Sequence, residues 1–302
     1  MYDLIVIGGG PAGLTATIYA IRKRLNVLLV SKDLGGKTNY HLELPDMKTY
    51  RLITGTEIVN KFKSELEYLK FARHMEPVVK VEKNNGDFVV HTKGGGELLA
   101  KAVIIATGAQ QQWLNVPGEK EYLSKGLCYS ALSYAPLFID RKTVVVGEGD
   151  LALRSAAELS TVAGHVHVVG TSHEALLTPL GQMLDEAENV TVLENYRVAS
   201  VSGNGYCNRV IVESPEGKQI EIEADGTFVE KALIANAAMV TDLVELDEQG
   251  FIKVDPYSRT SVPGLFAAGD VTNIYAEQVL VAVGEGVKAA LSAYEYLLPR
   301  LK

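Results

Sequence analysis

The hydrophobic pattern at the start of the chain predicts a strand, a glycine-rich turn, a helix and a second strand. Residues 3–7 are aliphatic from the second residue onward, which is typical of a strand buried on both faces of a parallel sheet. The turn GGGPAG occupies residues 8–13, a helical pattern covers residues 11–23, and a second apolar run covers residues 26–30. This order predicts a βαβ unit with a GxGxxG turn between its first strand and its helix.

The same pattern returns near the middle of the chain. A valine-rich strand at residues 143–146 runs into GEGDLA at residues 147–152, and a helical pattern then extends to about residue 163. The next strand covers residues 165–169. Two similar halves predict an α/β fold with two Rossmann-like, three-layer dinucleotide-binding domains.

Short strands and further elements follow each βαβ unit. Glycine- and asparagine-rich turns separate the short strands, as in β-hairpins. The predicted strands cover residues 78–82, 87–92, 97–99, 102–106, 197–201, 209–213, 228–235 and part of 264–270, and predicted helices cover residues 56–73 and 276–298.

The first glycine turn has the chemistry of a pyrophosphate site. Gly8 permits the tight turn, Gly10 lets a pyrophosphate approach the backbone, and Gly13 lets the helix pack on the strand. The helix that starts at Pro11 and Ala12 offers free N–H groups to an anion. The acidic ribose ligand expected after the second strand is absent, because Ser31 and Lys32 stand there. We expect Ser31 to bind a ribose hydroxyl.

Composition and charge narrow the class of protein. The chain has 302 residues, is 47% apolar and carries a net charge of −8, which argues against nucleic acid as its main partner. The apolar run at residues 5–21 contains glycines and a proline, so it fits a nucleotide turn and not a membrane span. No basic leader is seen, and Cys128 and Cys207 match neither zinc nor CxxC spacing. We expect a cytoplasmic protein without a metal site.

These motifs resemble the low-molecular-weight thioredoxin reductases, a family of flavoproteins with two dinucleotide-binding domains, over essentially the full length. The motifs that carry the resemblance are GGGPAG at residues 8–13, IIATGA at 104–109, VPGE at 116–119, VVVGEGDLA at 144–152 and TSVPGLFAAGD at 260–270.

The resemblance implies FAD as the cofactor of the first domain. It assigns residues 1–112 and 246–302 to a discontinuous FAD domain and residues 113–245 to an inserted NAD(P)-like domain, and it implies a homodimer. Asp270 would contact the ribityl and pyrophosphate region, and Gln278 and Val279 would lie at the pyrimidine edge, where a helix dipole favours the anionic reduced flavin. Further cofactor contacts are expected at Gly36, Lys37, Thr38, Asn39, Val79, Thr107, Gly108 and Gly269.

The chain departs from the family where the redox-active cysteines belong. Ser130 and Ser133 occupy the two thiol positions, and Tyr134 occupies that of the acidic proton donor. A hydroxyl group forms no disulfide, so we expect dithiol exchange to be absent. Cys128 stands two residues too early and is interpreted as a packed small residue. Tyr129 or Tyr134 could stack on the flavin or pack in the core, and both readings stay open.

Two further departures concern the electron donor and the flavin. The strand at residues 165–169 is followed by Gly170-Thr171-Ser172, with neither the arginines that hold NADPH nor an acid for NADH. Glu148 places a negative charge within the second turn, although Gly147 and Gly149 would still admit a nucleotide. Lys37 replaces a glutamine, and a lysine beside the flavin would raise its reduction potential.

We therefore predict an FAD-dependent oxidoreductase that resembles thioredoxin reductase but lacks dithiol chemistry. Electrons would pass through the flavin, and either NAD(P)H or a small carrier such as ferredoxin or flavodoxin would donate them. One alternative is a flavin- or nucleotide-binding protein without turnover. Another is a flavoprotein with a second nucleotide in the NAD(P)-like domain. His165 and His167 share one strand face and are expected to be structural.

Overall fold

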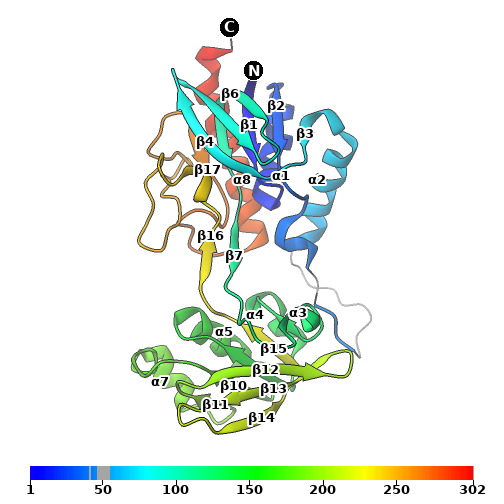
Figure 1. Cartoon of the computed structure of the whole chain (residues 1–302), viewed down its shortest axis with the longest axis vertical. Coiled ribbons are helices and arrows are strands. Elements are labelled where there is room, and N and C mark those ends of the chain that lie inside the picture. Colours follow the sequence, from blue (N-terminus) through cyan, green and yellow to red (C-terminus); the bar gives the residue numbers. More distant parts are fainter. Residues whose placement is uncertain (41, 46–54, 302) are drawn as a thin grey trace. The chain divides into compact units, whose positions relative to one another are not determined.

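The computed structural model describes residues 1–40, 42–45 and 55–301, and it divides into two compact units (Figure 1). Unit 1 comprises residues 1–39, 55–110 and 234–301, and unit 2 comprises residues 111–233 with the short segment 42–45. The discontinuous arrangement agrees with the prediction, but the boundaries differ. Residues 234–245 were expected in the inserted domain and belong to unit 1.

Unit 1 is built on a seven-stranded sheet in the order β3-β2-β1-β6-β5-β4, with β17 paired to the end of β6. β17, β6, β1, β2 and β3 run parallel, whereas the β4–β5–β6 meander is antiparallel. The strands are β1 (Tyr2–Ile7), β2 (Val27–Val30), β3 (Arg73–His74), β4 (Val78–Asn84), β5 (Asp87–Thr92), β6 (Glu97–Ile105) and β17 (Leu265–Ala267). The helices are α1 (Pro11–Arg22), α2 (Thr56–Tyr68) and α8 (Val279–Leu297), with 3-10 turns η1 (Gly36–Asn39), η2 (Lys70–Ala72), η4 (Ala238–Val240) and η5 (Leu298–Arg300).

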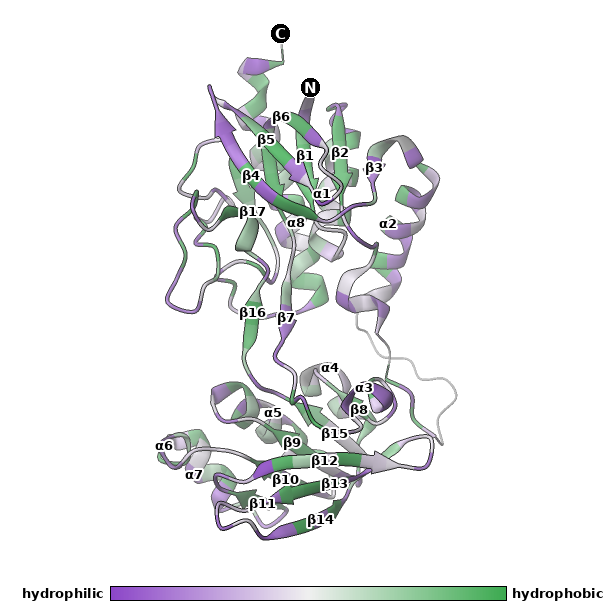
Figure 2. Ribbon diagram, viewed as in Figure 1, coloured by the Kyte–Doolittle hydropathy of each residue, from purple (hydrophilic) through white to green (hydrophobic). Residues whose placement is uncertain are grey.

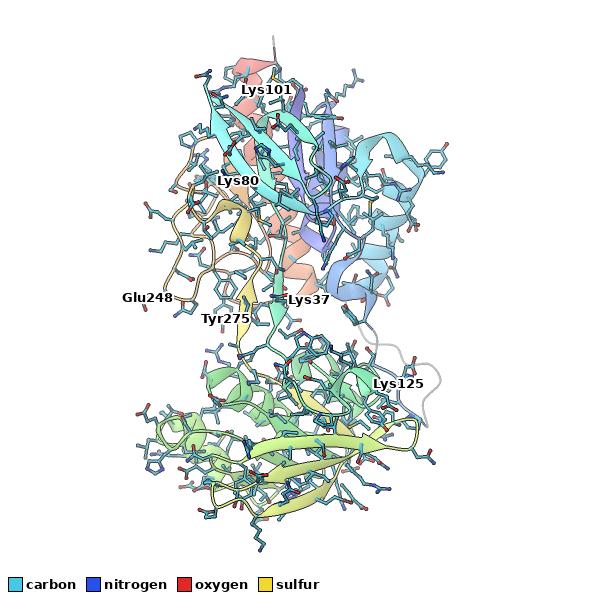
Figure 3. The ribbon with its side chains drawn as sticks, in the orientation of Figure 1. Lys37, Lys80, Lys101, Lys125, Glu248 and Tyr275 are labelled. Carbon is cyan, nitrogen blue, oxygen red and sulfur yellow. The ribbon has the colours of Figure 1, made fainter. Side chains whose placement is uncertain are left out.

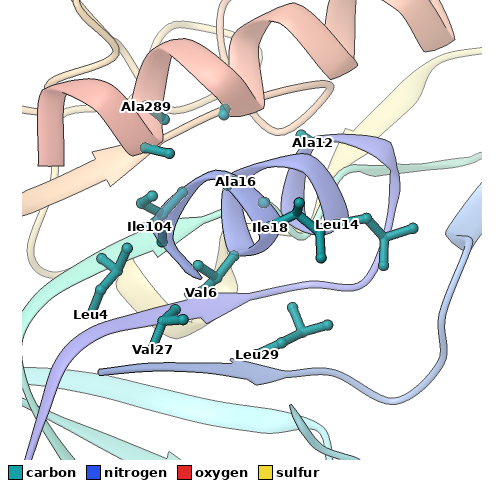
Figure 4. Packing of buried hydrophobic residues seen from close by; sticks show 14 of the residues in the cluster. Leu4, Val6, Ala12, Leu14, Ala16, Ile18, Val27, Leu29, Ile104 and Ala289 are labelled. Atoms are coloured by element: carbon teal, nitrogen blue, oxygen red, sulfur yellow. The ribbon is translucent and has the colours of Figure 1, made fainter. Parts of the chain in front are cut away.

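The apolar run of β1 is buried on both faces of this sheet. Leu4 and Val6 pack in a cluster with α1 and α8, whereas Ile5 and Ile7 pack on the opposite face. Figure 4 shows α1 lying over β1, with small side chains such as Ala16 facing α8. Each fully buried aliphatic side chain contributes about 1.5–3 kcal/mol, so this packing fixes the turn between β1 and α1.

Unit 2 repeats the plan with a parallel sheet in the order β11-β10-β9-β15-β8 and a separate antiparallel sheet β12-β13-β14. Its strands are β8 (Leu127–Cys128), β9 (Lys142–Val146), β10 (His165–Val169), β11 (Val190–Leu193), β12 (Arg197–Gly203), β13 (Cys207–Glu213), β14 (Gln219–Glu223) and β15 (Gly226–Val229). Its helices are α3 (Glu119–Tyr122), α4 (Ala131–Tyr134), α5 (Asp150–Ser160), α6 (His173–Leu176) and α7 (Pro179–Asp185), with the 3-10 turn η3 (Ala135–Leu137).

The internal repeat predicted from the sequence is visible in the strand orders. β3-β2-β1-β6 in unit 1 corresponds to β11-β10-β9-β15 in unit 2, and both include a parallel β–α–β pair. Figure 2 shows hydrophobic residues concentrated on the strands, whereas α2 is largely hydrophilic. The α/β fold class with two dinucleotide-binding-type units is therefore confirmed. Within the described ranges, no helix combines the length and the apolar character that crossing a bilayer requires.

Several predicted elements end differently in the structure. The strand expected over residues 228–235 is two strands, because the chain leaves β15 after Val229 and resumes as β16 (Leu233–Ala235), which pairs with β7 (Ala109–Gln111). The strands expected at residues 97–99 and 102–106 are one continuous strand, β6. The helix expected over residues 56–73 stops at Tyr68, and the chain then forms η2 and the short strand β3.

Candidate functional site

The turn between β1 and α1 is closed by contacts that only glycine permits. A Cβ atom on Gly13 would lie 1.8 Å from the Gly8 carbonyl oxygen, and one on Gly8 would lie 2.2 Å from the Ala106 oxygen. Gly8 has a φ of 112°, which a side chain disfavours. Gly10 differs, because a Cβ there would meet no atom within 4 Å. The turn is therefore tight on its inner side and open at Gly10.

The first turn of α1 offers backbone N–H groups without a competing acid. Gly10 is the N-cap residue, no side chain caps the helix, and the first turn contains no acidic residue. α1 is 12 residues long, so the positive end of its dipole adds to the anion-binding character of these N–H groups. This geometry fits a pyrophosphate at Gly10, as the sequence predicted.

Ser31 lies at the end of β2 and is buried. Its hydroxyl donates a hydrogen bond to the Asp33 carbonyl oxygen at 2.7 Å. The proton of Ser31 is thus already engaged, and Ser31 can only accept a hydrogen bond from a ribose hydroxyl. Lys32 is exposed beside it.

The predicted flavin-proximal segment forms η1, which lies against the phosphate turn. Gly35 N–H donates to the Gly9 carbonyl at 2.7 Å, and a Cβ on Gly36 would lie 3.2 Å from Gly10 Cα. Thr38 Oγ1 donates to the Gly35 carbonyl, and Asn39 Nδ2 donates to the Leu34 carbonyl. The polar groups of Thr38 and Asn39 therefore hold the segment together.

Lys37 and Asp270 form an ion pair within unit 1. Lys37 Nζ lies 2.9 Å from Asp270 Oδ2, and their side chains are 38% and 17% exposed. Asp270 follows Gly269, where a Cβ would lie 3.0 Å from the Ala12 Cβ of α1. The structure thus places two residues that are far apart in the sequence beside the same turn.

Asn236 is a site residue that the sequence did not reveal. Its side-chain Nδ2 donates to the Thr107 carbonyl at 3.0 Å, and Thr107 Oγ1 donates to the Asn236 carbonyl at 2.7 Å. These bonds fix the turn at Thr107-Gly108, where Gly108 has a φ of 69° and open space around it. Asparagine after a short strand is too common a signal to have marked this role.

The helix α8 begins at Val279 and not near residue 276 as predicted. Gln278 is its N-cap residue, and no side chain caps the helix or places an acid in its first turn. Val279 and Leu280 pack on Gly55 at the start of α2. The N-terminus of α8 is therefore open to an anionic group, as that of α1 is. The predicted contact Val79 lies elsewhere, in β4, with its side chain 54% exposed.

The second glycine turn, in unit 2, has the shape of the first but a different charge. A Cβ on Gly147 would lie 2.2 Å from the Glu230 carbonyl oxygen, and Gly149 has open space around it. Glu148 and Asp150 are exposed at the start of α5, and Asp150 pairs with Arg154 at 2.8 Å. Two carboxylates beside the open glycine disfavour a pyrophosphate there.

The serines at the expected thiol positions lie at the start of the short helix α4. Ser130 Oγ donates to Ser133 Oγ at 2.8 Å. The buried Glu230 carboxylate accepts a hydrogen bond from Ala131 N–H at 2.6 Å. An acid therefore occupies the position where a helix N-terminus would otherwise stabilise a thiolate.

The neighbouring Tyr129 and Cys128 are committed to the interior of unit 2. Tyr129 OH donates to Glu119 Oε1 at 2.8 Å, and its ring meets Trp113 edge-on at 5.5 Å. Burial, with Glu119 nearby, raises the pKa of Tyr129. Burial also raises the pKa of Cys128 to about 12, which confirms the interpretation of this cysteine as a packed, inert residue. For Tyr129 the contacts favour packing.

His165 and His167 lie on one face of β10, as predicted, with ring centroids 4.6 Å apart. Together with Lys142 and Thr191 they line a cavity of about 440 Å³ against β14. His165 Nε2 lies 2.9 Å from Thr191 Oγ1. Across the described part of the chain, no three His, Cys, Asp or Glu side chains are grouped to hold a metal ion.

Comparison with protein families matches residues 2–286 to the family described as pyridine nucleotide-disulphide oxidoreductase. The chain belongs to this family. The thioredoxin reductase of Streptococcus pyogenes MGAS5005 has a similar structure, with a TM-score of 0.88, 34% identity and 98% coverage of both chains. The thioredoxin reductase of Giardia duodenalis is similar with a TM-score of 0.85 and 28% identity, covering 98% of each chain.

Curated relatives are longer than this chain. A protein of the alkyl hydroperoxide reductase system of Staphylococcus aureus and a protein named NADH dehydrogenase from Bacillus subtilis are each 32% identical over 300 residues. These matches cover 98% of the chain but 59% of the relatives' length. The resemblance to thioredoxin reductases is therefore confirmed at the level of family and fold.

FAD is the cofactor of this family, whose members also use NAD(P)H. The residues of unit 1 fit FAD, because Gly10 leaves room for a pyrophosphate and two helix N-termini face anions without acidic competitors. FAD supplies the two-electron chemistry when bound. Gly10 and α1 would hold its pyrophosphate, Ser31 its ribose, and Gln278 and Val279 its pyrimidine edge.

Proposed function

We propose that this chain is an FAD-dependent oxidoreductase whose flavin exchanges electrons without a dithiol step inside the chain. The observation that carries the proposal is the serine pair, Ser130 and Ser133, at the start of α4. The chain has two cysteines, Cys128 and Cys207, and both are buried. Burial raises both thiol pKa values, so neither offers a reactive thiolate at neutral pH.

We infer that NAD(P)H binds weakly and that the donor is either a nicotinamide at high concentration or a small redox protein. Glu148 and Asp150 oppose a pyrophosphate at Gly149. After β10, Ser172 caps α6 through its hydroxyl, and this segment offers no cation for a 2′-phosphate. One relative is named NADH dehydrogenase, which makes NADH the first nicotinamide to test. Ferredoxin and flavodoxin are the carriers to test next.

A cytoplasmic homodimer is the assembly and location we propose, since the thioredoxin reductase resemblance implies both. A second nucleotide in unit 2 is the alternative that the preserved shape of the Gly147–Gly149 turn supports. The ratio of extracted FAD to protein separates one bound nucleotide from two.

An anaerobic titration with NADH and NADPH tests the proposal through bleaching of the flavin's visible band. We expect slow, incomplete bleaching by either nucleotide and full bleaching by dithionite. The variant Glu148→Gly should need less nicotinamide for half-bleaching, whereas Glu248→Gly, which removes an exposed acid from unit 1, should match the unmodified chain. Fast bleaching of the unmodified chain at micromolar nucleotide would contradict weak binding, and reduction of a disulfide substrate would contradict the missing dithiol step.

A further inference from the structure

The Lys37–Asp270 ion pair lies beside the phosphate turn, and it distinguishes this chain from relatives that carry glutamine at the lysine position. We propose that Lys37 is the counter-ion that allows FAD to bind next to the Asp270 carboxylate. This inference rests on the assignment of FAD to unit 1.

Lys37 is anchored to the open side of the turn. Gly36 lies against Gly10, with 3.2 Å from its Cβ position to Gly10 Cα. Asp33 Oδ1 accepts from Gly36 N–H at 3.1 Å. The residue before Lys37 is therefore fixed next to the glycine that faces the pyrophosphate.

Asp270 is anchored to the other side of the same turn. Gly269 has a φ of 76° and contacts Ala12 and Ala282, which belong to the first turns of α1 and α8. The Asp270 side chain is 17% exposed, so its charge is only partly screened by water. A carboxylate here would repel the pyrophosphate, whose two negative charges α1 attracts.

The ammonium group of Lys37 removes this conflict, because at 2.9 Å from Asp270 Oδ2 it cancels the carboxylate charge. A different role is conceivable, in which Lys37 contacts the pyrophosphate directly. The two roles differ in one respect. A counter-ion matters only while Asp270 carries its charge, whereas a direct contact matters regardless of Asp270.

The test is a double-mutant cycle on the dissociation constant of FAD, measured by quenching of flavin fluorescence on adding apoprotein. Lys37→Gln should weaken binding about tenfold in the unmodified chain and less than about threefold in the Asp270→Asn background. Lys37→Arg, which keeps the charge, should stay close to the unmodified chain.

Lys101→Gln is the matched control. Lys101 Nζ lies 2.8 Å from Asp3 Oδ1, with 23% and 19% side-chain exposure, so it removes a comparable ion pair from the same unit. Lys101 lies at the far end of unit 1 from Lys37 (Figure 3), and its variant should bind FAD as the unmodified chain does.

Two results would overturn the proposal: Lys37→Gln binding FAD as tightly as the unmodified chain, or losing the same factor in both backgrounds. If Lys37→Gln does not fold, Lys37→Arg and Lys37→Met with circular dichroism replace it, and equal affinity of those two would also overturn it. Failure of the unmodified chain to bind FAD is a different outcome, because it removes the proposed function itself.

Discussion

Gly10 and Gly13 lie three residues apart in one turn, yet added methyl groups there would meet different surroundings. Gly13→Ala places its Cβ 1.8 Å from a backbone oxygen, so we expect unit 1 to lose about 1–3 kcal/mol of stability or more. Gly10→Ala has open space and an ordinary φ of −75°, so it should fold normally and bind FAD at least about tenfold more weakly.

Thermal unfolding without FAD and a separate FAD titration check both expectations. Gly149→Ala is the control, since it adds the same methyl group to the open position of the second turn. Unchanged FAD binding by Gly10→Ala would mean that the pyrophosphate does not lie at Gly10.

His167 makes the stability of unit 2 dependent on pH. Burial, with the positive charges of His165 and Lys142, lowers the pKa of His167 from 6.5 to about 4. Below pH 6.5 the unfolded chain binds a proton that the folded chain rejects, so stability is lost as pH falls from 6.5 towards 4. Glu221 and Glu223 line the same cavity from β14 and partly offset the charge.

We therefore expect His167→Gln to lose less stability than the unmodified chain between pH 7 and pH 5, by on the order of 1 kcal/mol after allowing for partial exposure. Urea unfolding at several pH values measures this difference. His173→Gln, which removes an exposed histidine, should leave the pH dependence unchanged. Parallel curves for the unmodified chain and His167→Gln would show that His167 is not the titrating group.

At the scale of elements, the β1–α1–β2 and β9–α5–β10 units could be predicted because their signals are local. A buried aliphatic run, a glycine turn and an amphipathic helix follow one another in the sequence. β3 could not, since two residues carry no periodicity and Arg73 is held by pairing with Leu29 of β2. The break between β15 and β16 depends on Glu230, whose carboxylate bonds to a residue 99 positions away.

The same distinction applies to the candidate site. Gly8, Gly10 and Gly13 were predictable because the motif is contiguous. The Lys37–Asp270 pair spans 233 positions, so each residue could be predicted as a cofactor contact while their pairing could not. Asn236 was missed because its partner Thr107 lies 129 positions away.

The geometry of α4 predicts what restored cysteines would do. Because Ser130 Oγ and Ser133 Oγ lie 2.8 Å apart, Ser130→Cys with Ser133→Cys should form an intrachain disulfide after a small adjustment. Once reduced, the two thiols should titrate above their usual range, because the Glu230 carboxylate lies at the N-terminus of α4. Adding Glu230→Gln should lower the thiol pKa.

Mass spectrometry after alkylation detects the disulfide, and pH-dependent alkylation rates report the thiol pKa. Ser130→Cys alone is the control for reactivity without a partner. Two alkylated cysteines under oxidising conditions, or no change of thiol pKa with Glu230→Gln, would contradict this account of α4.

At the scale of the whole molecule, the two units have separate cores. Phe88 lies in a cluster of unit 1 residues, whereas Phe228 meets Phe138 edge-on at 5.1 Å within unit 2. Both Phe88 and Phe228 are fully buried. FAD contacts are assigned to unit 1 alone, so the stabilisation by bound FAD should appear in that unit.

We expect calorimetry to resolve two unfolding transitions, of which FAD raises one. Saturating FAD, at about 100 times its dissociation constant, stabilises the unit that binds it by about 2.7 kcal/mol. Phe88→Ala and Phe228→Ala each remove a buried ring at a cost of about 3–5 kcal/mol, so Phe88→Ala should lower the FAD-sensitive transition and Phe228→Ala the other. A single transition that both variants lower, or a rise of both transitions with FAD, would mean that the units unfold as one and that the repeat seen in the strand order is not a division in stability.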